Sequence, residues 1–330
     1  MALGNQDGYR VCWRVTTGEV VLAVAIGSGG EWVAGVSDDG YLHCFGQDGR
    51  QLWQAPIGGD SGDVAYAESA KVFIASSRDN GSLLFVDSTG TLLDTWNLGS
   101  SGVWGIACTP DAETIAVGLR SGGIRFLDAM RREEKWRFEE ESFIWHVGLC
   151  PDARRIVAAS RGNCAILLDW GGRLVWKLDG SEDFVGVAIS EDGRTVVAGD
   201  WDSTLHCVAD DRSRKWRYTT GGKSFKGLAM TPRADYIVAA GESGPDAEGA
   251  AYLFDGTGNL MWECPTAGNA HDTAITPDGH FVAAGSQTGE ILLLENLLPP
   301  VGASVAREGP FAGAIARSHV IRTITTGRPR

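Results

Sequence analysis

The chain has 330 residues, of which 43% are hydrophobic and 22% are charged, and it contains 45 glycines and 12 tryptophans. This globular composition excludes collagen, coiled coil and extended disorder. The formal net charge of −13 argues against nucleic-acid binding by the bulk field of the protein, because phosphate contacts need lysine and arginine. The seven cysteines include no C-x-x-C pair, so the sequence predicts neither a disulfide framework nor a zinc ribbon.

Targeting signals are the next feature that the sequence can exclude. The first ten residues lack a basic stretch followed by an apolar stretch, so we expect no signal peptide. No apolar run reaches the length of about 18 residues that a membrane span needs. We therefore predict a cytoplasmic protein without a membrane span.

A tryptophan recurs at nearly constant intervals, at positions 13, 53, 96, 136, 176, 216 and 262. The copy from Phe184 to Tyr218 contains four short apolar or alternating runs, separated by turns rich in Gly, Asp and Ser. Such a pattern predicts four antiparallel strands in each unit. No segment has the periodicity of a long amphipathic helix, so the predicted fold class is all-β.

The four runs of each unit have distinct characters. The first is built of small residues, as in Val24-Ala-Ile and Val187-Ala-Ile, which suits a crowded inner strand beside a central axis. The second ends in Ala or Gly, the third ends in an acidic turn such as Asp255, and the fourth carries the tryptophan. Seven such units predict a single seven-bladed β-propeller of four-stranded blades.

The ends of the repeat predict how the ring closes. The last unit has three strands and ends at Glu295, while a lone strand with Trp13 opens the chain. We expect residues 9–15 to supply the outer strand of blade seven, because this pairing removes an open sheet edge. The predicted domain is residues 1–296, followed by a C-terminal extension of residues 297–330.

Residues 9–296 resemble the prokaryotic WD-repeat and PQQ-like β-propeller repeat proteins. The resemblance rests on a D-x-x-G-x-x-x-W motif, seen at Asp169–Trp176 and Asp255–Trp262, and on Pro-Asp-Gly turns such as the one at Pro277. The Trp-Asp and Gly-His pairs of WD repeats are absent from their usual places, so the resemblance is architectural. It implies the propeller fold, which hosts many functions. We interpret the repeated tryptophans as packing between blades.

Motifs of catalysis are largely missing. The segment 222–224 imitates the end of a phosphate-binding loop, but Arg217 stands where that loop needs a glycine. No nucleophile elbow and no His-Glu-x-x-His occurs. His43 and His206 each lie in a Leu-His-Cys strand, but they are four blades apart and too distant to share one zinc ion. We predict a protein that is not an enzyme and has no catalytic residue, metal or cofactor.

One alternative is a small-ligand-binding or quinoprotein-like enzymatic propeller. Quinoprotein dehydrogenases also dock their blades through tryptophans, but that resemblance would imply eight blades, export, calcium and, commonly, a vicinal cysteine pair. The sequence has seven units and no Cys-Cys. A loop carboxylate pair, Asp200 with Asp202, could act as a catalytic dyad, although acidic loop residues more often form turns.

The phase of the strands predicts a binding face. Loops from the second to the third strand, and from the fourth strand to the next blade, emerge on one face of a propeller. We assign to these loops aromatic and cationic residues of the types enriched at interaction hot spots, with His146 and His271 nearby: Trp104, Trp145, Trp201, Arg78, Arg120, Arg161 and Lys226. Matching blade positions predict that the three arginines cluster and that Trp104 lies near Trp145.

The predicted partner of this face is an acidic surface or segment of another protein. The alternative is that the tryptophans tuck into the channel mouth and that the arginines pair with local aspartates, such as Asp79 or Asp202. A small-molecule ligand is not expected.

Residues 297–330 differ from the rest of the chain. Proline at 299 and 300 ends the last strand, because proline cannot donate to a strand ladder. Five arginines and one glutamate give this tail a net charge of +4. Since the whole chain carries −13, residues 1–296 carry −17. We predict a docking arm whose Arg317, Arg322 and Arg328 contact a partner, in an accessory subunit of a larger intracellular assembly. The alternative is a tail that straps its own ring.

Overall fold

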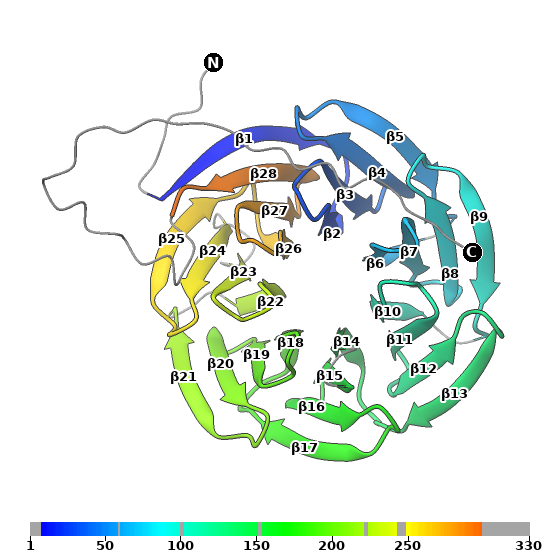
Figure 1. The fold of residues 1–330 in the computed structure, drawn as a ribbon, viewed down its shortest axis with the longest axis vertical. Coiled ribbons are helices and arrows are strands. Elements are labelled where there is room, and N and C mark those ends of the chain that lie inside the picture. The colour runs from blue at the N-terminus through cyan, green and yellow to red at the C-terminus, as the bar shows by residue number, and fades with distance from the viewer. Residues whose placement is uncertain are drawn as a thin grey trace, which may run out of the picture.

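The computed structural model describes residues 8–58, 60–99, 102–150, 154–220, 224–242 and 249–298. This part of the chain forms seven antiparallel sheets of four strands each, arranged as blades around one central axis (Figure 1). The described residues contain no helix, and therefore no helix that could cross a membrane. The predicted all-β, seven-bladed propeller is confirmed.

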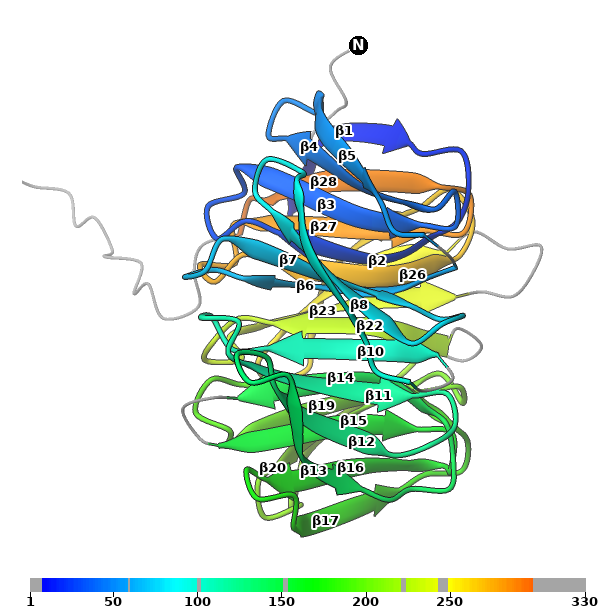
Figure 2. The same cartoon turned by 90° about the vertical axis from the view of Figure 1, so that its right-hand side faces the viewer.

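The blades follow one another along the chain, and each begins at its inner strand. Blades one to three comprise β2 (Val21–Ile26), β3 (Trp32–Ser37), β4 (Tyr41–Gly46), β5 (Gln51–Pro56), β6 (Ser61–Ala67), β7 (Val72–Ser77), β8 (Ser82–Asp87), β9 (Leu92–Asn97), β10 (Val103–Cys108), β11 (Thr114–Leu119), β12 (Ile124–Asp128) and β13 (Glu133–Phe138). Blades four and five comprise β14 (Ile144–Cys150), β15 (Arg155–Ser160), β16 (Cys164–Asp169), β17 (Leu174–Asp179), β18 (Phe184–Ile189), β19 (Thr195–Asp200), β20 (Thr204–Ala209) and β21 (Arg214–Thr219). Blades six and seven comprise β22 (Ser224–Met230), β23 (Tyr236–Glu242), β24 (Ala250–Asp255), β25 (Leu260–Pro265), β26 (Ala270–Ile275), β27 (Phe281–Ser286), β28 (Glu290–Asn296) and β1 (Tyr9–Thr16). In the side view the loops gather at the two faces of the ring (Figure 2).

The ring closes through the first strand. β1 pairs antiparallel with β28, from Tyr9 opposite Asn296 to Thr16 opposite Glu290, so it is the outer strand of blade seven (Figure 1). An ion pair of 2.7 Å between Arg14 Nη1 and Glu290 Oε1 crosses the same two strands. The expected closure by residues 9–15 is confirmed, and β1 pairs the edge of β28 that would otherwise be open.

The fourth-strand tryptophans join each blade to the next. Trp53 of blade one donates its indole N–H to the carbonyl of Ser88 in the third turn of blade two, at 2.9 Å. That turn is closed by Asp87, whose Oδ1 accepts the backbone N–H of Thr89 and Thr91. Gly90 ends the turn at a φ of 85°, directly under the Trp53 ring. Four other fourth-strand tryptophans also donate to a backbone carbonyl of the next blade, at 2.9 to 3.1 Å: Trp13, Trp136, Trp176 and Trp216. Trp262 donates instead to the side-chain Oδ1 of Asn296 in blade seven, at 3.2 Å. The D-x-x-G-x-x-x-W motif is therefore a device for packing blades together, as interpreted from the sequence.

The inner strands are as crowded as their small residues predict. A Cβ at Gly105 would lie 2.9 Å from the Cα of His146 in the next blade. Aligned by their register, the seven inner strands carry at this position only three polar side chains, Asp63, His146 and Asp272, among small residues: Ala23, Gly105, Gly186 and Gly227. These three side chains are the starting point of the site.

Candidate functional site

A β-bulge in each inner strand positions the candidate site. The pairing with the second strand shifts register at this point, for example between Val103 and Gly105 in β10 and between Ile144 and His146 in β14. A bulge re-aims a side chain out of the regular alternation. In each inner strand the bulge residue, such as Trp104 or Trp145, and the residue that follows it therefore both face the central axis. Trp104, Trp145 and Lys226 lie in these strands, which corrects the prediction that they belong to loops.

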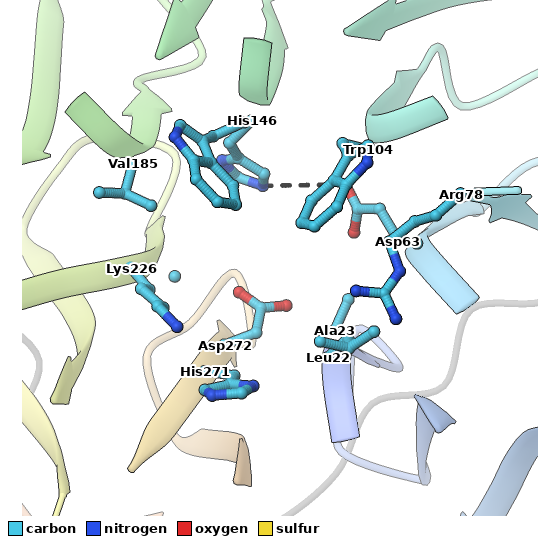
Figure 3. Close-up of a pocket in the computed structure, with 13 residues that line it drawn as sticks. Leu22, Ala23, Asp63, Arg78, Trp104, His146, Val185, Lys226, His271 and Asp272 are labelled. Carbon is cyan, nitrogen blue, oxygen red and sulfur yellow. Dashed lines mark ion pairs between the residues drawn. The ribbon is translucent and has the colours of Figure 1, made fainter. Parts of the chain in front are cut away.

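The bulge residues surround a cavity of about 100 Å³ on the central axis, which we call the axial cavity (Figure 3). Its walls come from the inner strands of all seven blades, with one residue from the loop directly after β7: Leu22, Ala23, Gly62, Asp63, Arg78, Trp104, Trp145, His146, Val185, Lys226, Gly227, His271 and Asp272. A wider hollow of about 280 Å³, the rim hollow, shares Arg78, Trp104 and Trp145 with it. The remaining walls of the rim hollow are Asp60, Asp79, Arg120, Phe143 and Arg161. The two hollows are therefore neighbours, with these three side chains between them.

The aromatic side chains pack as one cluster. The ring centroids of Trp104 and Trp145 are 5.1 Å apart in an edge-to-face arrangement, and Phe143 lies 4.4 Å from Trp145. Trp201 lies 5.8 Å from Trp145 and is 40% exposed. Trp104 and Trp145 are half-buried, and their indole nitrogens are buried without a hydrogen-bond partner among the described residues. The prediction that Trp104 lies near Trp145 is confirmed, and both also line the axial cavity, as the alternative interpretation expected.

The arginines meet around the rim hollow, and two of them have acidic partners. Arg78 Nη2 lies 2.6 Å from Asp38 Oδ1, and its guanidinium carbon stands 4.9 Å over the Trp104 ring. Arg161 Nε lies 3.4 Å from Asp183 Oδ2. Arg120 forms no ion pair with any described residue. The suggested partners Asp79 and Asp202 are wrong, because the carboxylates that the tertiary structure brings close are Asp38 and Asp183: Asp38 comes from the preceding blade and Asp183 from the loop before β18.

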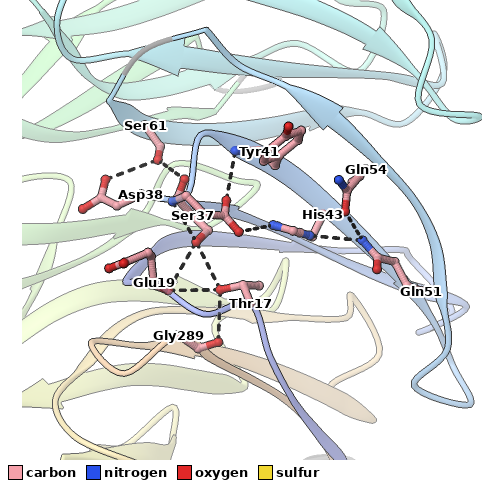
Figure 4. A network of polar contacts seen from close by, with 11 residues as sticks. Thr17, Glu19, Ser37, Asp38, Tyr41, His43, Gln51, Gln54, Ser61 and Gly289 are labelled. Atoms are coloured by element: carbon pink, nitrogen blue, oxygen red, sulfur yellow. Dashed lines mark hydrogen bonds and ion pairs between the residues drawn. The ribbon is translucent and has the colours of Figure 1, made fainter.

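Asp38 is itself held in a network where blades seven, one and two meet (Figure 4). Ser61 donates to the Ser37 carbonyl at 2.6 Å and lies 3.4 Å from Asp38 Oδ1. Thr17 donates to the carbonyl of Gly289 in blade seven at 3.2 Å. The Asp38 carboxylate, which binds Arg78, is thus part of a hydrogen-bond network that links neighbouring blades.

Two buried aspartates at the axis escaped the sequence analysis. Asp63 is 6% and Asp272 is 9% exposed. Each binds the middle of the next blade's inner strand, because Asp63 Oδ2 accepts the N–H of Ile106 at 2.8 Å and Asp272 Oδ2 accepts the N–H of Val24 at 2.9 Å. The signal in the sequence was an aspartate at a repeat position that otherwise holds mostly Gly or Ala.

Burial changes the titration of these two acids. It raises the pKa of the Asp63 carboxyl, and the nearby His146 partly offsets this effect. The pKa of Asp272 lies well above its ordinary value, first because of burial and then because of the negative charge of Asp63. His146 Nε2 stands 4.0 Å from Asp63 Oδ2, while its Nδ1 lies 3.1 Å from the carbonyl of Val187.

Lys226 and His271 share one carboxylate. Glu242 at the end of β23 forms an ion pair with Lys226, and His271 Nε2 lies 3.4 Å from Glu242 Oε1. Burial would raise the pKa of Glu242, but the hydrogen bond from His271 and the charge of Lys226 hold that pKa below its ordinary value. Glu242 therefore stays ionised and neutralises Lys226.

The other histidines that the sequence singled out bind aspartates of their own blades. His43 Nε2 binds Asp39 at 2.8 Å, and His206 Nε2 binds Asp200 at 2.8 Å. No group of three or more His, Cys, Asp or Glu in the described ranges could hold a metal ion. Burial raises the pKa of the Cys44 thiol to about 12, so this cysteine is a core residue and not a nucleophile.

Several residues that the sequence singled out lie outside the described residues. They are residues 222 and 223 of the phosphate-loop-like segment and the tail arginines Arg317, Arg322 and Arg328. Their predicted roles stay predictions.

The protein is thus a seven-bladed β-propeller, and its candidate site is a cavity on the central axis at one face. A family model of PQQ-like repeats, described as outer membrane protein assembly factor BamB, matches residues 120–295. Since this match spans more than half of the chain, the protein belongs to that family. It is also 25% identical, over 133 residues, to the WD repeat-containing protein SL1-17 of Schistosoma mansoni. That match covers 40% of this chain and 44% of the relative, so it spans less than half of the relative's length.

Proposed function

We propose that this protein is a non-catalytic interaction module, an accessory subunit that binds a partner protein through the rim hollow. The observation that carries the proposal is the convergence of three arginines and three tryptophans from several blades on one face: Arg78, Arg120, Arg161, Trp104, Trp145 and Trp201. Tryptophan and arginine are the residue types that dominate binding energy at protein interfaces.

The charge of the rim hollow favours an acidic segment as the partner. Arg120 is exposed and has no ion-pair partner among the described residues, and the Arg161 side chain is 62% exposed. An acidic side chain that reaches these guanidinium groups gains bidentate hydrogen bonds. Trp201, at the edge of the aromatic cluster, offers a large apolar surface beside them.

The comparisons support a role in assembly at the level of class. The matched family is described as an assembly factor, and the curated relative is a WD-repeat protein. We extend this role to the present chain as an accessory subunit of a larger intracellular assembly, with residues 297–330 as a docking arm. Location in the cytoplasm is part of the same proposal.

Charge reversal at the rim tests the proposal. The partner is first identified by cross-linking and mass spectrometry in the native host, and its affinity is then measured with purified proteins. Arg120→Glu with Arg161→Glu should weaken the complex at least about tenfold, because each change replaces an attraction with a repulsion. Trp201→Ala should weaken it by roughly 1–2 kcal/mol.

The matched control reverses the charge of two arginines on the opposite face of the propeller. Arg50 and Arg173 lie in turns between the third and fourth strands, and both side chains are 87% exposed. Arg50→Glu with Arg173→Glu makes the same change in net charge and should leave the affinity within about twofold. Equal loss in both double variants, or an interface on the turn face alone, overturns the proposed function.

A further inference from the structure

The cations around the axial cavity are already neutralised by carboxylates behind them. Arg78 binds Asp38, and Lys226 binds Glu242, which also faces His271. These pairs leave the cavity no net positive charge from its lysine and arginine. Neither Lys226 nor Arg78 forms an ion pair with the two axial aspartates among the described residues.

The axial aspartates, in contrast, have no strong cation of their own. The donors that bind the carboxyl groups of Asp63 and Asp272 are the backbone N–H groups of Val64, Ile106 and Val24, which carry no net charge. Among the described residues, His146 is the one basic side chain with a nitrogen within 4.0 Å of either carboxyl group, at 4.0 Å from Asp63. Buried charges in proteins are normally paired, because an unpaired buried carboxylate is costly. The groups of this cavity without a lysine or arginine partner are therefore the carboxyl groups of Asp63 and Asp272, which are negative when they ionise.

The walls beside these carboxylates are aromatic. Trp104 and Trp145 line the cavity, and Figure 3 shows the Trp104 ring and the carboxylates of Asp63 and Asp272 directed towards its centre. The buried indole nitrogens are not presented to the cavity, since they have almost no accessible surface. A ligand in the cavity meets the ring surfaces, which attract cations through their quadrupole.

The size of the cavity limits what can enter. Its volume is about 100 Å³, whereas a protein cavity of roughly 150 Å³ is large enough to bind benzene. The head group of an organic cation fits this space, and a whole peptide segment does not. The remainder of such a ligand would lie in the neighbouring rim hollow.

We propose that the axial cavity binds the ammonium or guanidinium head of a basic side chain, placed between Asp63 and Asp272 and against Trp104 and Trp145. The source of that side chain, a segment of the partner lying in the rim hollow, rests on the proposed function. The chemistry of the cavity does not depend on it. The partner segment would thus combine acidic residues for Arg120 and Arg161 with one basic residue for the axis.

Small probes test the cavity without any partner. Calorimetric titration of the full chain with methylguanidinium is compared with methylurea, which has nearly the same shape and no charge. The same comparison is made between n-butylammonium and n-butanol. We expect at least one cation to bind about tenfold or more tightly than its neutral analogue. Equal binding of cations and neutral analogues, or no binding by either, overturns the inference, and this comparison needs no variant.

Isosteric variants then locate the site. Asp272→Asn keeps an acceptor for the N–H of Val24, and Asp63→Asn keeps one for the N–H of Ile106 while losing the one for Val64. Each variant should lower cation affinity about tenfold. The matched control is Asp202→Asn, which removes an exposed carboxylate on the same face outside the cavity. Cation binding that survives both axial variants, or that falls equally in the control, rejects the site.

The two proposals fail in different experiments. If methylguanidinium binding depends on Asp272 while reversal of Arg120 and Arg161 leaves the partner complex intact, the rim function is wrong and the cavity chemistry stands. If rim reversal breaks the complex while methylguanidinium binds no better than methylurea, the cavity inference alone is wrong. Where both hold, Asp272→Asn should also weaken the partner complex about tenfold.

Discussion

At the scale of single residues, the axial aspartates occupy a repeat position that holds Gly or Ala in four of the other five blades and His146 in the fifth. Each accepts the N–H of the next blade's inner strand, which an asparagine could do as well. Their charge is therefore unnecessary for holding the blades together, and burial makes it costly. A costly group that packing does not require is typical of functional sites.

The free energy of unfolding should show this cost as a function of pH. The pKa of Asp272 is raised in the folded protein above its ordinary value of 3.8, so the native state holds a proton that the unfolded chain has released. The contribution of this group to stability is present below pH of about 4 and is lost as pH rises through the folded pKa. Asp272→Asn lacks this titration and should gain stability relative to the wild type between pH 4 and pH 7, by roughly 1 kcal/mol or more.

Urea unfolding at several pH values, without added organic cation, measures this difference. Taking wild type minus variant cancels other carboxylates, such as Asp128, whose pKa is lowered to about 2. A difference that stays constant with pH, or that favours the wild type as pH rises, contradicts the assignment of a raised pKa to Asp272.

At the scale of elements, the contact between a fourth-strand tryptophan and the next blade's turn is the repeating joint of the ring. The indole N–H of Trp53 binds the turn at Ser88, and its ring covers Gly90. The turn fits under the ring because glycine has no side chain and accepts a positive φ. The packing of Trp53 on the next blade therefore depends on the turn conformation that Gly90 allows.

Replacing Gly90 with alanine should break this joint. The new Cβ would lie 2.8 Å from the Trp53 ring, and the φ of 85° would also strain an alanine. Gly40 is the matched control, because its φ is 88° and a Cβ there meets nothing within 4 Å. We expect Gly90→Ala to lower the free energy of unfolding by about 1–3 kcal/mol more than Gly40→Ala. Equal losses in chemical denaturation would show that the turn's conformation, and not tryptophan docking, governs stability.

At the scale of the whole molecule, closure couples the two ends of the repeat. β1 buries Tyr9 and Trp13, which are 3% and 8% exposed, against blades six, seven and one. The ring is completed by antiparallel pairing with β28. Without β1, β28 would present an open edge, which invites association.

Deletion of residues 1–16 tests the closure. It removes β1 and its apolar contacts, so the melting temperature should fall by about 10 °C or more, with a tendency to associate. Deletion of residues 1–7, which leaves β1 in place, is the control and should change the melting temperature little. Calorimetry and light scattering measure both effects, and an unchanged melting temperature in the longer deletion would be incompatible with a closing role for β1.

The sequence by itself determined the propeller, its seven blades, the closing strand and the packing role of the tryptophans. It could do so because these features are local patterns that recur at a fixed interval, and because an open edge has one economical partner. The clustering of Arg78, Arg120 and Arg161 followed from the same regularity, since equivalent positions in adjacent blades lie side by side.

Only the tertiary structure decided what lies at the axis. The bulges break the alternation from which the faces of a strand are predicted. Trp104 and Trp145 were therefore assigned to loops, whereas they lie in inner strands and line the cavity. Asp63 and Asp272 belong to blades two and seven and line one cavity because the ring closes between them. Arg78 takes Asp38 from the neighbouring blade, a choice set by distance in space and not in sequence. Charge balance within a cavity depends on such pairings between blades, and these exist only once the ring is formed.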